Sequence, residues 1–399
     1  MYNFVSITNS YQMNIKRELI CISTILLLCA GVTAAQEDTG WTVEVIENNK
    51  ARHFHETMPA GQYSGITYIG DNTFAVVSDD DPGYGFHLWK MELDSVNGQV
   101  MAMENLGFRG DGGEKKHDLE GIAYDPYART LWISNENEHA VVELDMEGQP
   151  TGRRIDMPDS IKESITSNRS LEALCYDAQS RTLWVGIEST IKLDGEASTA
   201  TNGKPSLCRI MAYDEQLRMT KSIRFKTQTP KGQEEAKVFA MGISAMASIG
   251  DGYLLVLERE ARVPEQLLGA TATARIYIIN AAATPDGEIA EKRLLATIET
   301  KANLLKQDWA NFEGMALTPA DAHGNRVLML VADSQGQYKG LLKDWVKTLK
   351  IREIRHTTEA HNKAAEVHDK STEPHGKAVK EENKAVEVQE TSEKKEEKQ

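Results

Sequence analysis

Acidic residues recur at a fixed spacing in this chain. Glu120 and Glu136 are 16 residues apart, and Glu172 and Glu188 are separated by the same interval. Partial copies of this pair occur elsewhere: the acids that open a copy are Glu120, Glu172 and Glu313, and those that close one are Asp80, Glu136, Glu188, Glu258 and Asp333. Carboxylates held together repel one another unless they are protonated or bridged by cations. Ca²⁺ accepts about 6–8 oxygen ligands in loose geometry, so these acids predict a Ca²⁺ site if the fold brings them together.

Basic residues flank several of these acids, namely Arg109, Lys116, Arg169 and Arg259. An arginine beside a carboxylate at a concave mouth can hold a phosphate through two parallel hydrogen bonds. A salt bridge to the adjacent acid is the alternative for each of them. Arg259 is the strongest candidate for a functional role because it lies within a strand end and not in a loop. His117, beside Asp118, could act as a general acid or could simply be solvated.

The acids belong to a longer repeated segment. DLEGIAYDPYARTLWISNE, residues 118–136, returns 52 residues later as SLEALCYDAQSRTLWVGIE, residues 170–188. Weaker copies begin near residues 64, 244 and 313, which makes five units in order along the chain. A fixed period of this size indicates one supersecondary unit that is used repeatedly.

Each unit reads as four short strands separated by turn residues. In the second unit we expect strands at 121–124, 130–134, 140–145 and 152–157. The Leu-Trp strands are apolar without alternation, as expected of strands that are buried on both faces. Four-stranded sheets repeated around an axis form a β-propeller, so the fold class is all-β with five blades. A sixth blade in the longer gaps and a stacked β-solenoid are the alternatives.

The two ends of this domain are expected to meet. The last unit lacks an outer strand after its third, near 341–351, and residues 41–46 can supply it. In a propeller the first strand of each blade lines the central channel. The start of that strand and the end of the antiparallel second strand then meet at one rim, which would bring the acids together. A repeated glutamate can equally be a joint that accepts backbone N–H groups from the next blade, and both interpretations stay open for the first-strand acids.

The N-terminal residues predict export. From a start at Met13, two basic residues precede an apolar stretch at 19–30 that is too short to span a bilayer. Small residues follow it, so 1–35 is interpreted as a signal peptide. Cys29 suggests a lipid anchor, but Leu28 occupies the position before it, where a small residue is expected. The protein is therefore expected to be periplasmic or extracellular.

Domain boundaries follow from composition. Residues 36–350 are expected to form the propeller, and 351–399, rich in Lys and Glu, a disordered tail. Four histidines in that tail could bind metal weakly, although biased composition explains them as well. Cys175 and Cys208 are expected to be buried free thiols because strands two apart are too distant to bridge. The net charge of −15 excludes an ordinary nucleic-acid binder.

The segments DLEGIAYD, SLEALCYD, GISAM…LLVLERE and NFEGMALTP…LMLVADS resemble the phytase-like family, also called esterase-like activity of phytase. The resemblance implies a β-propeller in which repeated Glu and Asp residues hydrolyse phosphoesters. Carried over to this chain, the resemblance implies phosphoester hydrolysis at Glu120, Glu136, Glu172, Glu188, Glu258, Arg259, Glu313 and Asp333. Together with the flanking residues above, we expect catalysis by Glu120, Glu258, Arg259 and Glu313, substrate binding by Arg109, Lys116 and Arg169, and metal binding by Asp80, Glu136, Glu172, Glu188 and Asp333.

The leading hypothesis is therefore an exported, Ca²⁺-assisted phosphoric ester hydrolase, expected to be monomeric and to act on a small phosphorylated substrate. Bound cations would let an acidic protein hold an anionic phosphate and would lower the pKa of an attacking water. The alternative from another class is a non-catalytic propeller that binds a ligand or a protein partner. A lactonase-type propeller with one central Ca²⁺ is a third possibility. No Walker loop, G-x-S-x-G elbow or H-E-x-x-H motif is present.

Overall fold

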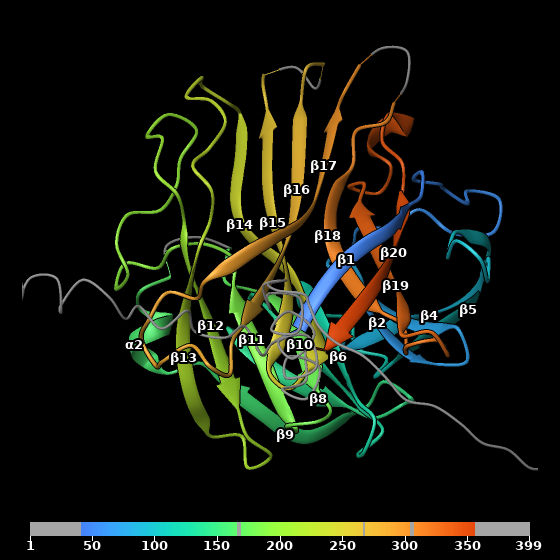
Figure 1. Cartoon of the computed structure of the whole chain (residues 1–399), viewed down its shortest axis with the longest axis horizontal. Helices are drawn as coiled ribbons and strands as arrows, with labels where there is room; N and C mark the ends of the chain where they lie inside the picture. Colours follow the sequence, from blue (N-terminus) through green and yellow to red (C-terminus); the bar gives the residue numbers. More distant parts are fainter. Residues whose placement is uncertain (1–40, 166–168, 266–267, 304–306, 356–399) are drawn as a thin grey trace, which may run out of the picture. The chain divides into compact units, whose positions relative to one another are not determined.

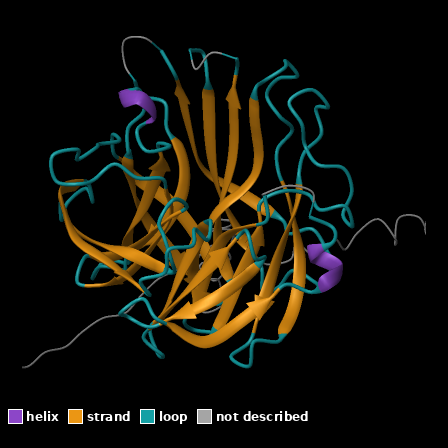
Figure 2. Ribbon diagram, turned by 180° about the vertical axis from the view of Figure 1, so that it is seen from behind, coloured by secondary structure: helices purple, strands orange, loops and turns teal. Residues whose placement is uncertain are grey.

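The computed structural model describes residues 41–165, 169–265, 268–303 and 307–355. The expected signal peptide lies outside these ranges, as do residues 356–399 of the expected tail. No helix in the described ranges is long and apolar enough to cross a bilayer. Almost every element is a strand, as Figure 2 shows from behind; the exceptions are a short helix α2 (Asp159–Lys162) and a 3₁₀ turn η1 (Tyr338–Gly340).

Twenty strands form five four-stranded antiparallel sheets (Figure 1). Blade one contains β2 (Tyr63–Gly70), β3 (Thr73–Ser78), β4 (Gly85–Leu93) and β5 (Val100–Gly110), and blade two contains β6 (Leu119–Asp125), β7 (Thr130–Asn135), β8 (Ala140–Leu144) and β9 (Pro150–Asp156). Blade three contains β10 (Leu171–Asp177), β11 (Thr182–Ile187), β12 (Leu207–Tyr213) and β13 (Met219–Lys226), and blade four contains β14 (Val238–Gly250), β15 (Tyr253–Val263), β16 (Thr271–Asn280) and β17 (Lys292–Lys301). Blade five contains β18 (Asn311–Leu317), β19 (Asn325–Asp333), β20 (Val346–Arg355) and the N-terminal β1 (Trp41–Asn48). The predicted five-bladed propeller is confirmed.

The ring closes as expected from the sequence. β1 pairs antiparallel with β20, so the N-terminal strand is the outer strand of the last blade. β20 (Val346–Arg355) begins and ends several residues later in the chain than the strand expected at 341–351. It therefore extends past the expected domain boundary at residue 350. The first strands contact one another in the order β2, β6, β10, β14, β18 and back to β2, which encloses the central channel.

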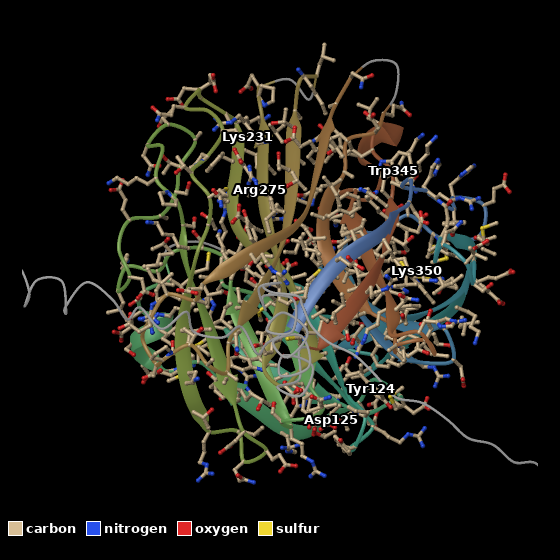
Figure 3. The ribbon with its side chains drawn as sticks, in the orientation of Figure 1. Tyr124, Asp125, Lys231, Arg275, Trp345 and Lys350 are labelled. Carbon is tan, nitrogen blue, oxygen red and sulfur yellow. The ribbon has the colours of Figure 1, made fainter. Side chains whose placement is uncertain are left out.

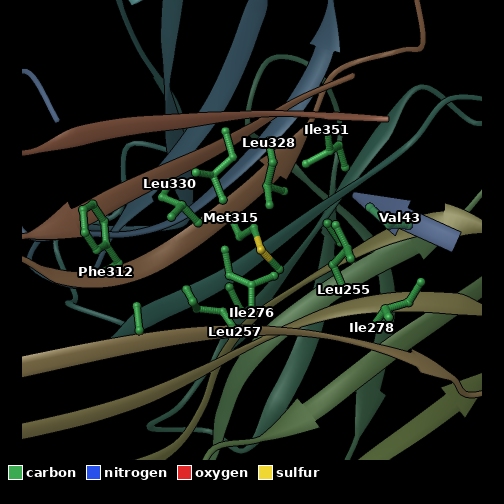
Figure 4. Packing of buried hydrophobic residues seen from close by; sticks show 14 of the residues in the cluster. Val43, Leu255, Leu257, Ile276, Ile278, Phe312, Met315, Leu328, Leu330 and Ile351 are labelled. Carbon is green, nitrogen blue, oxygen red and sulfur yellow. The ribbon is translucent and has the colours of Figure 1, made fainter. Parts of the chain in front are cut away.

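Each pair of neighbouring blades shares its own hydrophobic core. Figure 4 shows the core between blades four and five, where Leu255 and Leu257 of β15 face Leu328 and Leu330 of β19. All four of these side chains are fully buried. The apolar second strands without alternation are thus explained, because each one is packed between two sheets. Cys175 and Cys208 are buried free thiols, as predicted.

Glycines near the start of the first strands of blades one and two are required by the close approach of neighbouring first strands. A Cβ atom added at Gly121 would lie 2.6 Å from the backbone oxygen of Glu172, and one at Gly65 would lie 2.3 Å from that of Glu120. Real Cβ atoms do not approach backbone oxygens so closely. The backbone of the glutamate in one blade is therefore held against the glycine of the preceding blade, although blade three has Ala173 at this position.

Replacement of Gly121 by Ala should lower the free energy of unfolding by about 1–3 kcal/mol, the usual cost of forcing extra volume into a packed interior. Urea unfolding measures this change. The reverse change at the matching position of blade three, Ala173→Gly, removes volume and should cost about 1 kcal/mol or less. A Gly121→Ala variant as stable as the parent chain would contradict the close approach.

Candidate functional site

One rim of the channel is built from the starts of the first strands and the ends of the second strands. In blade two, Leu119 pairs with Asn135, and the backbone N–H of Glu136 donates to the carbonyl of Asp118 at 3.0 Å. In blade three, the N–H of Glu188 donates to the carbonyl of Ser170 at 2.8 Å. The opening and closing glutamates of one blade therefore lie side by side, and each contributes a carboxylate to the same mouth.

Carboxylates from three blades meet at this mouth. Oxygens of Asp79, Asp118 and Glu120 lie within 4.8 Å of one another, and so do oxygens of Glu120, Glu136 and Glu172. Glu120 belongs to both sets. Of the acids predicted from the sequence, the fold brings Glu120, Glu136 and Glu172 together, and it adds Asp79 and Asp118. We call these five residues the acidic cluster.

Burial and mutual repulsion perturb every member of the acidic cluster. Burial, and then the neighbouring carboxylates, raise the pKa of Glu120 and of Glu172 well above the ordinary value. The same two causes raise the pKa of Glu136 to about 9 and that of Asp79 to about 7. Burial also raises the pKa of Asp118. At neutral pH Glu136 would therefore hold a proton unless a bound cation replaced it, and Asp79 would be partly protonated.

The adjoining side of the mouth carries its own counter-charge. The guanidinium of Arg259 donates hydrogen bonds to Glu313 and Glu188, and its Nη2 lies 3.8 Å from Glu172 Oε1. Burial lowers the pKa of this guanidinium, but Glu188 and Glu172 outweigh burial, so the net pKa is raised. Arg259 therefore stays charged and neutralises the carboxylates of blades three and five.

The mouth is consequently asymmetric in charge. Among the described residues, no ion pair joins a lysine or arginine to Asp79, Asp118, Glu120 or Glu136. Asp79 Oδ1 and Glu188 Oε2 are buried and accept no hydrogen bond within the described ranges. Oxygen donors with unused lone pairs, from several strands, fit a hard cation such as Ca²⁺. Glu188 belongs to blade three and is paired with arginines. The acids of blades one and two, Asp79, Asp118, Glu120 and Glu136, are therefore the ones that could hold such a cation.

Glu258 lies apart from the acidic cluster. In blade four, Gly242 pairs with Arg259 and Ile243 with Glu258, so Arg259 occupies the rim position that an acid fills in the other four blades. Successive residues of a strand face opposite sides, which turns Glu258 away from the channel. Its carboxylate contacts Arg275 and Lys292 inside blade four, at 2.9 Å each, and accepts the N–H of Gln228 at 3.0 Å.

Replacement of Glu258 by Gln should therefore act on stability. The side chain is fully buried, and loss of one partner from a buried ion pair costs about 3–5 kcal/mol. Lys292 would lose its carboxylate partner and Arg275 would keep only Glu260, so thermal unfolding should occur at a markedly lower temperature. Replacing exposed Glu147 by Gln is the matched control, with little expected effect. An unchanged melting temperature for Glu258→Gln would show that this contact contributes nothing.

Asp80 is a second departure from the sequence interpretation. Its exposed side chain pairs with Lys116 on the surface, and Asp79 fills the rim position instead. The N–H of Asp79 donates to the carbonyl of Gln62, as the N–H of Glu136 does to Asp118. The signal was available: the first hairpin is one residue shorter, so an interval of 16 from Ser64 overshoots the rim position by one.

The remaining predicted residues differ in whether they reach the mouth. Arg169 borders it, with Nε 3.9 Å from Glu188 Oε2. Asp333 closes blade five and accepts the N–H of Gln335 at 2.7 Å, while burial raises its pKa. Arg109 does not join the mouth, because it pairs with exposed Glu147. His117 is buried against Tyr84, with ring centroids 4.0 Å apart, and burial lowers its pKa.

Comparison with known proteins identifies one family. A family model described as "Phytase-like: Esterase-like activity of phytase" matches residues 58–335. No curated protein matches the chain. Among solved structures, the catalytic domain of a Coprinopsis cinerea GH62 alpha-L-arabinofuranosidase is 11% identical with a TM-score of 0.39, covering 78% of this chain and 96% of that one. The PQQ-bound aldose sugar dehydrogenase of Streptomyces coelicolor is 14% identical with a TM-score of 0.34, covering 79% and 99%.

Proposed function

The chain belongs to the phytase-like family, and from this premise we propose that it is a phosphoric ester hydrolase whose acidic cluster binds Ca²⁺. The observation that carries the proposal is the pair of carboxylate triplets that share Glu120. Among the described residues, Glu172 is the one member of these triplets that forms an ion pair with an arginine or lysine. Membership in the phytase-like family, whose description names an esterase-like activity, is consistent with a hydrolase. Calcium, the phosphoester substrate and export belong to the proposal.

Charge explains why a cation is needed. A phosphoester approaching the mouth meets the carboxylates of the acidic cluster, which would repel it. Bound Ca²⁺ would supply a positive potential for the phosphate and would lower the pKa of a water molecule. Asp79, Asp118, Glu120 and Glu136 are the residues that would hold it, and Glu120 is common to both triplets. Glu120 would therefore be a ligand whichever of the two triplets held a cation.

The protein's own groups have distinct parts in the reaction. Arg169, at the edge of the mouth with a side chain that is 30% exposed, is positioned to hold a phosphate oxygen. In the proposed reaction a cluster carboxylate accepts a proton from water as the water oxygen attacks phosphorus. The bond from phosphorus to the ester oxygen breaks, and the departing alkoxide takes up that proton from the carboxylic acid and leaves as the alcohol. Glu313 and Glu188 hold Arg259 in place and are already neutralised by it.

A non-catalytic propeller is the second candidate, and one contact favours it. The N–H of Ser170, which begins blade three, donates to the carboxylate of Glu136 in blade two. Such a contact is what a structural joint between blades provides. In this interpretation the acids stabilise the ring and turn over no substrate.

Hydrolysis of a panel of phosphomonoesters and phosphodiesters by the full chain, with Ca²⁺ and with EDTA, separates the two candidates. Turnover that depends on Ca²⁺ is the result we expect. No turnover in either condition, from protein that circular dichroism shows to be folded, would overturn the hydrolase and leave the binding propeller.

A further inference from the structure

The opposite mouth of the channel has a different chemistry. Along each first strand, every second residue faces the channel, so the residues two and four positions after the rim form two further rings. The middle ring is entirely apolar: Ile66, Ile122, Leu174, Met246 and Met315. The last ring contains three tyrosines: Tyr68, Tyr124, Tyr176, Ser248 and Leu317. Both rings line one cavity at the end of the channel away from the acids.

The middle ring separates the two mouths. Its five apolar side chains border the tyrosine-lined cavity on one side. On the other side they border the small space below the rim that Glu172, Glu313, Ser64 and Ser244 line. Figure 3 shows Tyr124 and Asp125 near the lower end of the view and Lys231 near its top. A ligand in the tyrosine-lined cavity would therefore not contact the acidic cluster.

The tyrosine-lined cavity has the size and composition of a small-molecule pocket. Its volume is about 470 Å³, and typical ligand pockets contain about 300–1,000 Å³. None of its lining residues is charged. Pro126 and Pro319 stand at its edge, in the turns that follow β6 and β18.

The tyrosine rings are held in place by polar contacts outside the cavity. The Tyr176 hydroxyl is hydrogen-bonded to Asp125 of the neighbouring blade. Burial is the larger cause of the raised pKa of Tyr176, and the Asp125 carboxylate raises it further. The Tyr68 hydroxyl accepts the N–H of Asn72 at 3.4 Å. Anchored hydroxyls leave the ring faces half-buried and available. Offset or edge-to-face contact with a second ring is the interaction that such faces favour.

We propose that this cavity is a second binding site, specific for an uncharged aromatic ring compound. The absence of charge among its lining residues disfavours phosphates, metal ions and zwitterions, which would lose hydration without a compensating partner. Its concave form, bounded by turns, suits a small molecule. The site is independent of the proposed phosphoester chemistry, because the middle ring divides the channel.

Isothermal titration of the full chain with 2-naphthol, a neutral two-ring probe, tests the proposal. We expect one saturable site per chain. Tyr124→Ala removes one ring face and should weaken binding about 5- to 10-fold. Ala178→Trp introduces a large side chain at the cavity wall and should abolish binding. Tyr127→Ala is the matched control, because Tyr127 is 59% exposed in the adjacent turn and does not line the cavity.

Two further readouts make the outcome decisive. Circular dichroism and melting temperature must show that each variant is folded. Binding in EDTA and in Ca²⁺ should agree within about twofold, because the probe does not meet the acidic cluster. The proposal is overturned if no saturable binding occurs, or if Tyr124→Ala and Ala178→Trp bind 2-naphthol as the parent chain does. Equal weakening by Tyr127→Ala would also overturn it, because binding would then be a general surface property.

Discussion

Replacement of Glu120 by Gln is expected to reduce Ca²⁺-dependent phosphoester turnover by about 100-fold or more, since loss of even an outer-shell partner of a metal ligand costs about 10- to 100-fold. Glu120 supplies an oxygen to both carboxylate triplets, so no other single residue contributes to as much of the proposed cation site. The amide keeps the shape of the side chain and removes its charge. Steady-state turnover at saturating Ca²⁺, and the Ca²⁺ concentration for half-maximal rate, measure the effect.

Stability distinguishes a ligand from a joint in the same variant. Burial penalises the charged form of Glu120, so the Gln variant should be at least as stable as the parent chain in EDTA. A pure joint predicts the opposite, a less stable variant with no activity to lose. Glu147→Gln, on the surface, controls for the general effect of removing one negative charge. Full activity in Glu120→Gln would refute the proposed cation site.

Bound Ca²⁺ should reverse the way in which the free energy of unfolding depends on pH. Without a cation, the raised pKa values of about 7 for Asp79 and about 9 for Glu136 mean that the folded chain binds more protons than the unfolded chain. These groups titrate near pH 4 when unfolded, at about 3.9 for Asp and 4.3 for Glu. The stabilisation that they provide is therefore complete below pH 4 and is lost as pH rises towards 9.

Bound Ca²⁺ needs ionised carboxylates, so its stabilising effect should grow over the same range. At about 100 times the dissociation constant, a ligand adds about 2.7 kcal/mol to the free energy of unfolding. At an unfolding entropy of about 2.1 cal/mol/K per residue, this corresponds to about 4 °C for a domain of about 300 residues. Melting temperatures from pH 5 to 9, in Ca²⁺ and in EDTA, measure the difference. We expect it to be near zero at pH 5 and largest at pH 9.

Glu120→Gln supplies the control for this measurement, because it should flatten both curves. An equal effect of Ca²⁺ at every pH would show that the cation binds elsewhere, at groups that are already ionised at pH 5. No effect of Ca²⁺ at any pH would favour the structural interpretation of the acidic cluster.

The sequence alone predicted much of the architecture, because the repeat is a local property. Two copies that share the Leu-Trp strand and its turns must form the same unit, and each unit can bury its apolar strands only against a neighbour. The clustering of Glu120, Glu136 and Glu172 was predicted in the same way. In an antiparallel pair, the start of the first strand lies beside the end of the second strand. A closing strand at residues 41–46 followed from the missing outer strand of the last unit, and the structure has it as β1 (Trp41–Asn48).

The tertiary structure alone decided which acids face the channel. Side chains alternate along a strand, so a difference of one residue in hairpin length sends a neighbour to the opposite face. Asp79 and not Asp80 stands at the rim in blade one, and Arg259 and not Glu258 in blade four. Charge balance was equally beyond the sequence, because Arg259 contacts glutamates of blades three and five that lie 54 to 71 residues away. The order of residues determines where the strands form. The chemistry of the mouth depends on which side chains of those strands face the channel, and only the assembled ring determines that.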